Sequence, residues 1–450
     1  MGDARRRPYR PTSYVLLPVL ILIAAFWGWA FWKWPMRMFS LLPFALPFYL
    51  VRTSIGPLPT TMLELIILAT VIAWFIKFGW KGVREIKSAA PNWLLPTGLW
   101  LLAGFIGIFV AQNHIAALGL YRAYFVEPLL IFFIGLDLYR GDAKKEDAKR
   151  SEGTACRAPT ILSILLIILG LYAIIQYLTG WGIPAPWDAV IGRRAVGPFP
   201  YPNALSLFVT PIAALLFADF LKQISKRDNS KNRATQGVAP TISLLGFLFG
   251  LISIALAESN GGMIALAAAM FVASMFYKRA RIIAISLLIA IVIGIGAVSP
   301  LRQKVVSLVS FKQWSGMVRT VMWKESFAML KDHPVFGAGL GGYPDAIKPY
   351  HKATWMEIFQ YPHDIVLNLW SETGLLGIVA FGWILITWQK AEGRRQKGIP
   401  PAFCLLPSAI AVLTAILIQG LVDVPYFKND LAVMFWLLIL ITTQNLEFGI

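Results

Sequence analysis

The sequence has 450 residues, of which 57% are hydrophobic and only 14% are charged, and its mean hydropathy is +0.65. Soluble domains are nearer half apolar and a quarter charged, so this composition excludes an ordinary soluble protein. The net charge of +18 does not indicate nucleic-acid binding, because most lysines and arginines fall in short loops between apolar runs, where they orient spans.

Apolar runs of about 17–25 residues recur along the chain, and each suits one helical crossing of a bilayer. We predict spans at residues 14–32, 61–77, 93–111, 117–137, 159–178, 204–221, 241–257, 262–277, 282–298, 365–388, 402–419 and 430–444. The fold class is therefore all-α, a polytopic transmembrane helical bundle of about twelve spans. The basic start resembles a signal peptide, but no small-residue cleavage site follows, so we expect a retained first span.

Basic loops test this span list. Loops rich in lysine and arginine occur at residues 77–87, 140–157, 222–233, 278–281 and 390–397. With twelve spans they all fall on the side of the N-terminus, which the positive-inside rule makes cytoplasmic. The apolar stretch 39–51 is short and interrupted by Pro43 and Pro47, so we expect a re-entrant or interfacial segment.

The chain divides into N-terminal transmembrane helices at 1–298, a large external loop at 299–363, and C-terminal transmembrane helices at 364–450. The large loop is net basic, and its apolar side chains between residues 318 and 330 recur near helical spacing. We expect an amphipathic helix on the membrane surface there. Cys156 and Cys404 have no spacing typical of metal sites or of a disulfide framework.

Two external arginines, Arg193 and Arg194, precede a turn rich in glycine and proline that leads into a span. They either anchor lipid headgroups or bind an anionic substrate, since arginine forks suit phosphate and pyrophosphate oxygens. Asn203 stands at the start of the following helix and is a candidate cap.

Among the four histidines, His363 stands out because it follows Pro362 at the mouth of the span that begins near residue 365. An imidazole at this boundary could take a proton from a hydroxyl group. The alternative is a capping or interfacial histidine. The histidines show no metal-ligand spacing, so we expect no metal site.

Glu372 lies about two turns deeper in the same span, and buried acids in membranes usually face the bundle interior with a partner. It is eight residues from Asp364, so the two side chains could share one helix face. Arg122 and Glu127 also lie in one span, and we expect a structural ion pair between them.

Four stretches together resemble the O-antigen ligase and polymerase superfamily of bacterial envelope enzymes. They are "RAVGPFPYPNALSLF", "MVRTVMWKESFAMLKDHPVFGAGLGGY", "PHDIVLNLWSETGLLGIVAF" and "QGLVDVPYF", the last of which contains Asp423. Their order, and a large external loop between late spans, match the arrangement of that family. The resemblance runs from about Arg52 to the C-terminus.

The resemblance implies a glycosyltransferase of the GT-C type on the outer face of the bacterial cytoplasmic membrane. Such enzymes transfer a glycan from undecaprenyl pyrophosphate to a hydroxyl of a glycan, lipid or protein acceptor, without metal or other cofactor. Carried over to this chain, His363 becomes the candidate base, and Arg194 and Arg319 become the candidate pyrophosphate ligands.

Two positions depart from the pattern of the family. Asn260 stands where an arginine is expected, so either Arg193, Arg319 or Lys324 compensates in binding the donor, or the contact with the donor is different. Asp364 replaces an asparagine after the histidine, and its carboxylate would strengthen His363 as a base.

A transporter or flippase of lipid-linked glycans is the alternative. It should show inverted repeats and polar groups at the membrane midplane, and the sequence shows no repeat. A catalytically inactive relative is left open by Asn260.

Overall fold

A computed structural model describes residues 16–55, 58–144, 157–229, 239–311, 313–393 and 407–444. The basic N-terminal segment, Cys156, Cys404 and most of the long basic loops lie outside these residues.

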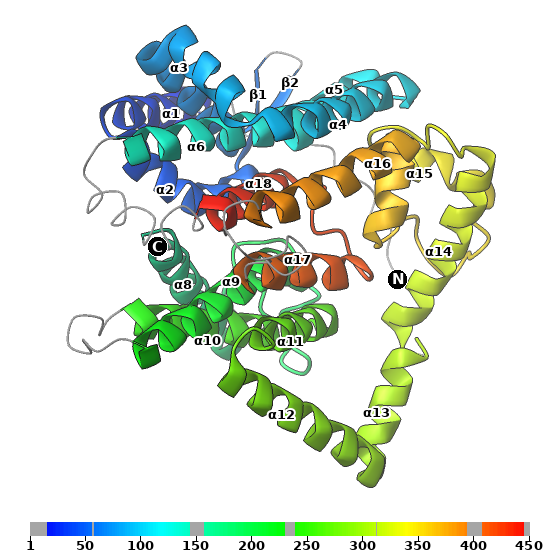
Figure 1. The fold of residues 1–450 in the computed structure, drawn as a ribbon. Helices are drawn as coiled ribbons and strands as arrows, with labels where there is room; N and C mark the ends of the chain where they lie inside the picture. Colours follow the sequence, from blue (N-terminus) through cyan, green and yellow to red (C-terminus); the bar gives the residue numbers. More distant parts are fainter. Residues whose placement is uncertain are drawn as a thin grey trace.

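The described chain is almost entirely helical (Figure 1). The α-helices are α1 (Leu16–Lys33), α2 (Pro35–Ala45), α3 (Met62–Ala89), α4 (Pro91–Val110), α5 (His114–Tyr121), α6 (Glu127–Lys144), α8 (Arg157–Thr179), α9 (Pro202–Asn229), α10 (Ala239–Leu256), α11 (Asn260–Ser274), α12 (Lys278–Ala297), α13 (Ser299–Val309), α14 (Trp314–Asp332), α15 (Tyr343–Ala346), α16 (Ile365–Gly393), α17 (Pro407–Gly420) and α18 (Asn429–Gln444). Shorter elements are the 3-10 helices η1 (Leu46–Leu50) and η3 (Lys348–Tyr350), the π-helical turn η2 (Arg122–Val126), and the strands β1 (Arg52–Ile55) and β2 (Leu58–Thr61).

Seven helices of the described chain are long and apolar enough to cross a membrane, and five shorter helices are also apolar. Each predicted span overlaps one of these helices. The all-α polytopic fold is therefore confirmed, and the protein is an integral membrane protein.

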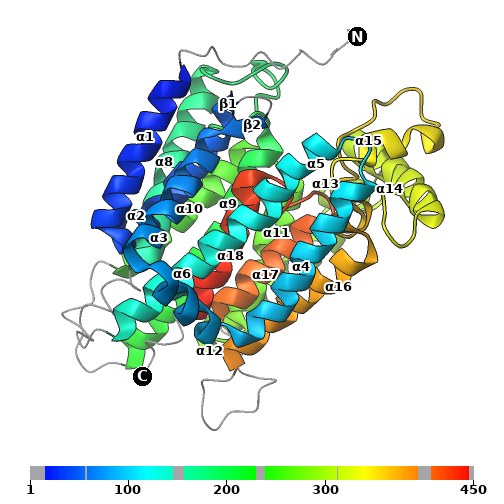
Figure 2. The same cartoon turned by 90° about the horizontal axis from the view of Figure 1, so that it is seen from above.

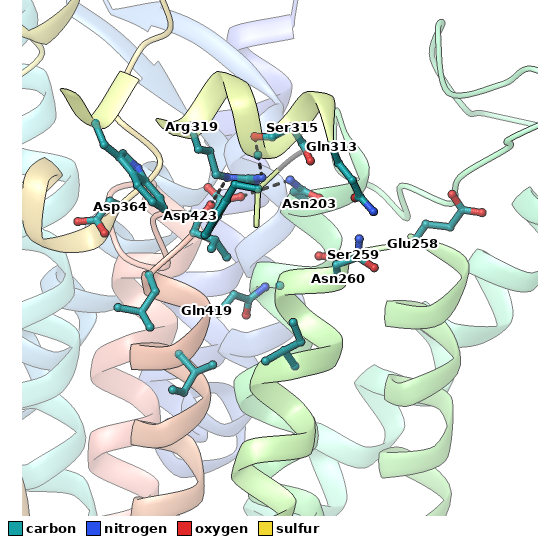
Figure 3. A pocket seen from close by; sticks show the side chains of 18 of the residues that line it. Asn203, Glu258, Ser259, Asn260, Gln313, Ser315, Arg319, Asp364, Gln419 and Asp423 are labelled. Atoms are coloured by element: carbon teal, nitrogen blue, oxygen red, sulfur yellow. Dashed lines mark hydrogen bonds between the residues drawn. The ribbon is translucent and has the colours of Figure 1, made fainter. Parts of the chain in front are cut away.

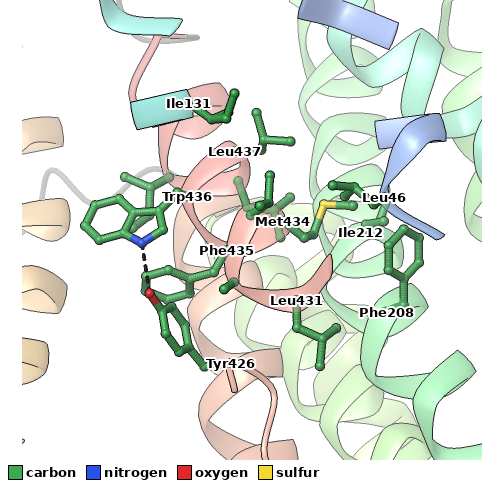
Figure 4. Packing of buried hydrophobic residues seen from close by; sticks show 14 of the residues in the cluster. Leu46, Ile131, Phe208, Ile212, Tyr426, Leu431, Met434, Phe435, Trp436 and Leu437 are labelled. Carbon is green, nitrogen blue, oxygen red and sulfur yellow. Dashed lines mark hydrogen bonds between the residues drawn. The ribbon is translucent and has the colours of Figure 1, made fainter. Parts of the chain in front are cut away.

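The core is centred on α18, which packs against α6, α9, α16 and α17. Residues 431–441 of this helix are at most 7% exposed, so it is surrounded on every side. Trp436 Nε1 donates to the hydroxyl of Tyr426 at 3.1 Å, and that hydroxyl donates to Tyr124 O at 2.8 Å (Figure 4). This buried polar pair is therefore satisfied inside an otherwise apolar cluster.

The first helix runs in the opposite direction to our expectation. Trp27 Nε1 donates to Thr70 Oγ1 at 3.0 Å, and Lys77 Nζ donates to Trp32 O at 2.5 Å, so α1 is parallel to α3. After α1 and before α3, the chain must therefore cross back to the end of the bundle at which α1 began. The helices α2 and η1 make this crossing (Figure 2). Helical residues 35–50 extend over about 24 Å, which is nearly the thickness of the hydrocarbon core.

The stretch 39–51 is thus part of a pass through the bundle, and the expectation of a segment confined to one side was wrong. We call the end of the bundle that carries α14 the loop end, and the end with Lys33 and Lys77 the basic end (Figure 2). Leu16 begins α1 at the loop end, so the expected placement of the first helix was also reversed.

An antiparallel hairpin, not expected from the sequence, joins this pass to α3. Arg52 pairs with Thr61, and Thr61 then caps α3 in a reciprocal capping box with Glu64. The hairpin therefore fixes where α3 begins at the loop end.

Helix α12 stands apart from the bundle and, with α13 and α14, forms an open V (Figure 1). None of its residues is buried, although its length and hydropathy are those of a membrane span. An exposed helix of this length and hydropathy suits a lipid surrounding.

The segment between α14 and α16 is held against the bundle by backbone hydrogen bonds. Ala338 N donates to Ser371 O at 2.7 Å, and Leu340 N donates to Gly107 O at 3.0 Å. Gly337 and Gly339 have positive φ, and a Cβ on either would overlap the backbone of α16 or α4. The glycine-rich sequence is therefore a close-packed connector.

Candidate functional site

A cavity of about 750 Å³ opens at the loop end, between α11, α14 and the turn from α17 to α18 (Figure 3). Its polar lining includes Arg194, Asn203, Asn260, Arg319, Asp364, Gln419 and Asp423. Apolar side chains line the rest, among them Ile264, Phe311, Ile418 and Leu421. The lining of the cavity thus has a charged part and an apolar part.

Arg194 is positioned by backbone carbonyls of the turn between α10 and α11. Its Nε donates to Ala257 O at 2.9 Å, and Nη2 donates to Glu258 O at 3.3 Å and to Asn203 Oδ1 at 3.4 Å. The guanidinium also lies 5.0 Å from the ring of Trp187. Burial lowers the pKa of Arg194, and Glu258 opposes that shift.

Arg319 enters the cavity from α14, on the side opposite Asn260 (Figure 3). Its Nε donates to Val422 O at 2.7 Å and its Nη1 donates to Ser315 O at 3.4 Å. Burial lowers the pKa of Arg319, while Asp423 and Tyr361 act in the opposite direction. Each arginine is thus fixed by carbonyls and retains donors for a ligand, since a guanidinium has five N–H groups.

His363 lies beside the cavity, where its partner is Asp423. The Nδ1 of His363 is 3.1 Å from Oδ1 of Asp423, whose other oxygen accepts from Asn203 Nδ2 at 3.4 Å. Burial would raise the pKa of Asp423, but the hydrogen bond and charge of His363, the N–H of Val424 and Arg319 together lower it. The ionised carboxylate can only accept, so Nδ1–H donates, and in the neutral imidazole Nε2 is then left as the proton acceptor.

The backbone of His363 has φ +49°, a left-handed conformation that is costly for a residue with a side chain. Its ring packs on Tyr361, with centroids 4.7 Å apart. The Tyr361 hydroxyl is 3.2 Å from that of Tyr201, which accepts a hydrogen bond from Lys428. Burial lowers the pKa of Lys428 to about 8, with Asp430 opposing, so this support for His363 includes a costly buried cation.

Asp364 does not contact His363 in the way that we expected. Its Oδ1 accepts from Leu367 N at 2.9 Å and so caps α16, while its carboxylate lies on the cavity. Burial raises the pKa of Asp364, although the N–H groups of residues 366 and 367 lower it. The carboxylate that orients the imidazole therefore comes from Asp423, sixty residues away.

Two of the predicted donor-binding residues lie elsewhere. Arg193 donates to the carbonyls of Tyr177 and Leu178 at 2.9 and 3.2 Å, where it caps the end of α8. Lys324 is on the outer side of α14 and does not line the cavity with Arg194 and Arg319. Asn203 does not act as a helix cap but bridges Arg194 and Asp423.

The expected supporting groups have partners. Arg122 pairs with Glu127 at 3.2 Å, as predicted, and also with Glu64, which accepts from Asn429 at 2.9 Å. The carboxylate of Glu372 accepts from Gly341 N at 2.6 Å and so ties the external segment to α16. Asn260 begins α11 on the cavity wall.

Asp423 and Gln419 were missed as candidates. Both lie in the stretch "QGLVDVPYF", which resembles the family, and Asp423 is also a carboxylate in the short turn between the last two spans. The described residues contain no cluster of three or more histidine, cysteine, aspartate or glutamate side chains that could hold a metal ion.

In a comparison with protein families, the model described as O-antigen ligase matches residues 245–382. This region includes the turn at Asn260, Arg319, His363 and Glu372, whereas Arg194 and Asp423 lie outside it. No curated protein matches the chain. Residues 245–382 are thus similar to the O-antigen ligase family, in agreement with the resemblance found in the sequence to the O-antigen ligase and polymerase superfamily.

Proposed function

We propose that this protein transfers a glycan from an undecaprenyl-pyrophosphate carrier to a hydroxyl group of an acceptor. The superfamily supports a membrane glycosyltransferase type of function, and the donor, the residues and the direction of transfer are our inference. The observation that carries the proposal is the convergence of Arg194 and Arg319 on one cavity, beside the His363–Asp423 pair.

The transfer would break the bond between the anomeric carbon and the pyrophosphate oxygen. As the acceptor oxygen attacks that carbon, Nε2 of His363 takes its proton, and Asp423 stabilises the imidazolium that forms. Arg194 and Arg319 hold the departing pyrophosphate and balance its charge. The apolar side of the cavity would accept the first isoprene units of the carrier.

Because the cavity is at the loop end, away from the lysines of the basic end, we propose that the reaction takes place on the external face of the cytoplasmic membrane.

Carrier-linked glycans in cells that lack the protein test the proposal. Complementation with wild type should restore the normal pattern, whereas His363→Ala should leave carrier-linked glycans accumulated. His333→Ala is the matched control, because His333 is an exposed histidine of the same loop and does not line the cavity. Single repeat units on the carrier would mean a polymerase, and long chains would mean a ligase.

Two results would reject the proposal. Full restoration by His363→Ala would remove the histidine from the mechanism. Unchanged carrier-linked glycans in cells without the protein would favour a transporter or a non-catalytic role instead.

A further inference from the structure

A second, smaller cavity lies on the outer side of α14 and has a volume of about 440 Å³. It is lined by Trp323, Lys324 and Phe327 of α14 and by Asp364 and Leu367 at the start of α16. Trp323 and Asp364 also line the larger cavity. The two cavities are therefore neighbours, separated by these two side chains.

We propose that this smaller cavity is the acceptor subsite, and that it binds the sugar ring whose hydroxyl is glycosylated. The inference rests on the proposed function and assigns a different place to each substrate. The pyrophosphate of the donor lies with Arg194 and Arg319, and the acceptor sugar lies on the other side of Asp364.

The lining has the chemistry that a sugar ring requires. A pyranose has a C–H face that packs on aromatic rings and a rim of hydroxyls that need donors and acceptors. Trp323 and Phe327 are four residues apart on one face of α14, and Phe327 is 48% exposed. Lys324 supplies N–H donors, and the Asp364 carboxylate supplies acceptor oxygens.

The same residues connect the cavity to the candidate base. Asp364 directly follows His363, and Trp323 Nε1 donates to Pro362 O at 3.1 Å, just before it. A sugar held between Trp323 and Asp364 would therefore lie against both neighbours of His363. This is where an acceptor hydroxyl must be for the imidazole to take its proton.

The charges favour a sugar over a lipid as occupant. A lipid chain in this cavity would lie against the carboxylate of Asp364 and leave it without hydration. Lys324 has no hydrogen-bond partner among the residues that the structure describes, so its ammonium is available to a ligand. Both features suit a ring with several hydroxyls.

Two probes separate the subsites in purified full-length protein. One is the free oligosaccharide of the acceptor, and the other is inorganic pyrophosphate. For a polymerase the acceptor oligosaccharide is a single repeat unit, and for a ligase it is the unglycosylated acceptor glycan from cells that lack the protein. Phe327→Leu and Lys324→Gln should raise the Kd of the oligosaccharide about five- to tenfold, the size expected for one aromatic or charged contact. The same variants should leave the Kd of pyrophosphate unchanged.

Matched controls are available for both probes. Phe336→Leu and Lys352→Gln change exposed residues of the same loop and should leave oligosaccharide binding unchanged. Arg194→Gln should weaken pyrophosphate binding about tenfold, while the neighbouring Arg193→Gln should not. Phe327→Trp keeps an aromatic ring and should bind the oligosaccharide more tightly than Phe327→Leu does. Thermal unfolding would verify that each variant is folded.

The subsite is rejected if wild type does not bind the oligosaccharide, or if Phe327→Leu binds it as wild type does. It is also rejected if Lys324→Gln weakens pyrophosphate binding, since the lysine would then belong to the donor. Different results would reject the proposed function. They are full activity of His363→Ala and an unchanged Kd of pyrophosphate in Arg194→Gln.

Discussion

At the scale of single residues, the central feature is the carboxylate that faces the imidazole of His363. Asp423 is 3% exposed, and it receives hydrogen bonds from His363, Asn203 and the backbone N–H of Val424. A buried carboxylate with three donors is held in one orientation, which fixes the ring beside it. Asp364 directly follows His363 in the sequence, but its carboxylate caps α16 and lies on the cavity wall.

The two aspartates should therefore respond differently to removal of their charge. We expect Asp423→Asn to lower the rate of glycan transfer about 10²-fold or more, because a neutral amide does not stabilise an imidazolium. Asp364→Asn should cost much less in maximal rate, because asparagine also caps a helix. Initial rates at saturating donor and acceptor would measure both; equal losses would contradict the assignment of Asp423.

The candidate residues show what the sequence could and could not predict. His363 and Arg194 were predicted because each carries a reactive group in an external segment that leads into a span, whereas Arg319 was predicted from the family resemblance. The partner of His363 was not found, because a hydrogen bond between residues sixty positions apart depends on tertiary structure alone. The same reason explains why the support from Tyr201 and Lys428 was missed.

At the scale of elements, the external segment is attached to α14 through His351. Its Nδ1 is 2.9 Å from Oε2 of Glu325, and its Nε2 is 3.0 Å from Met356 O. Oε1 of Glu325 also accepts from Lys352 N at 2.9 Å. These contacts hold the chain that leads to His363, so the geometry of the site depends on them.

This attachment should weaken at alkaline pH. The hydrogen bond to Glu325 raises the pKa of His351, and burial opposes the rise. Because the folded pKa is above the unfolded value, the contribution to stability is fully present below about pH 6.5 and is lost as pH rises through the raised value. We expect the difference in Tm between wild type and His351→Gln to be largest near pH 6 and to shrink towards pH 9.

Thermal unfolding in detergent at several pH values would measure this difference. Glu325→Gln is the control, because it removes the charge that raises the pKa of His351. A difference in Tm that stays constant with pH would contradict the assignment.

The predicted elements were correct where the signal is local. Every expected span overlaps an apolar helix, since hydropathy over about twenty residues is sufficient to identify one. The pass by α2 and η1 was missed because Pro43 and Pro47 interrupt it and its apolar part is short. Its contacts, among them those of Leu46 with the core around α18, are visible only in the assembled bundle (Figure 4).

At the scale of the whole molecule, the additional pass places the two ends of segment 35–60 on opposite sides of the bundle. If α2 and η1 cross, the start of α2, which carries Arg37, is at the basic end, and β1, which ends at Ile55, is at the loop end (Figure 2). If the segment were re-entrant, the two residues would share one side. Both side chains are exposed in the structure.

Cysteine labelling in intact cells distinguishes the two arrangements. In a variant with Cys156 and Cys404 changed to serine, we expect Ile55→Cys and Phe336→Cys to react with a membrane-impermeant maleimide. Arg37→Cys should react only after the membrane is opened, because it lies at the opposite end of the bundle. Labelling of Arg37→Cys and Ile55→Cys from the same side would refute the additional pass.

The exposure of helix α12 determines which substitutions its sequence tolerates. A Cβ on Gly294 or Gly296 would meet no atom within 4 Å, whereas one on Gly246 of α10 would lie 2.6 Å from the backbone of Ser163. Substitutions in α12 therefore need only preserve the length and apolar character of the helix. Those in α10 must also preserve the shape of the side chains that pack against α8. Over evolutionary time, α12 should diverge freely in sequence while the bundle beside it changes slowly.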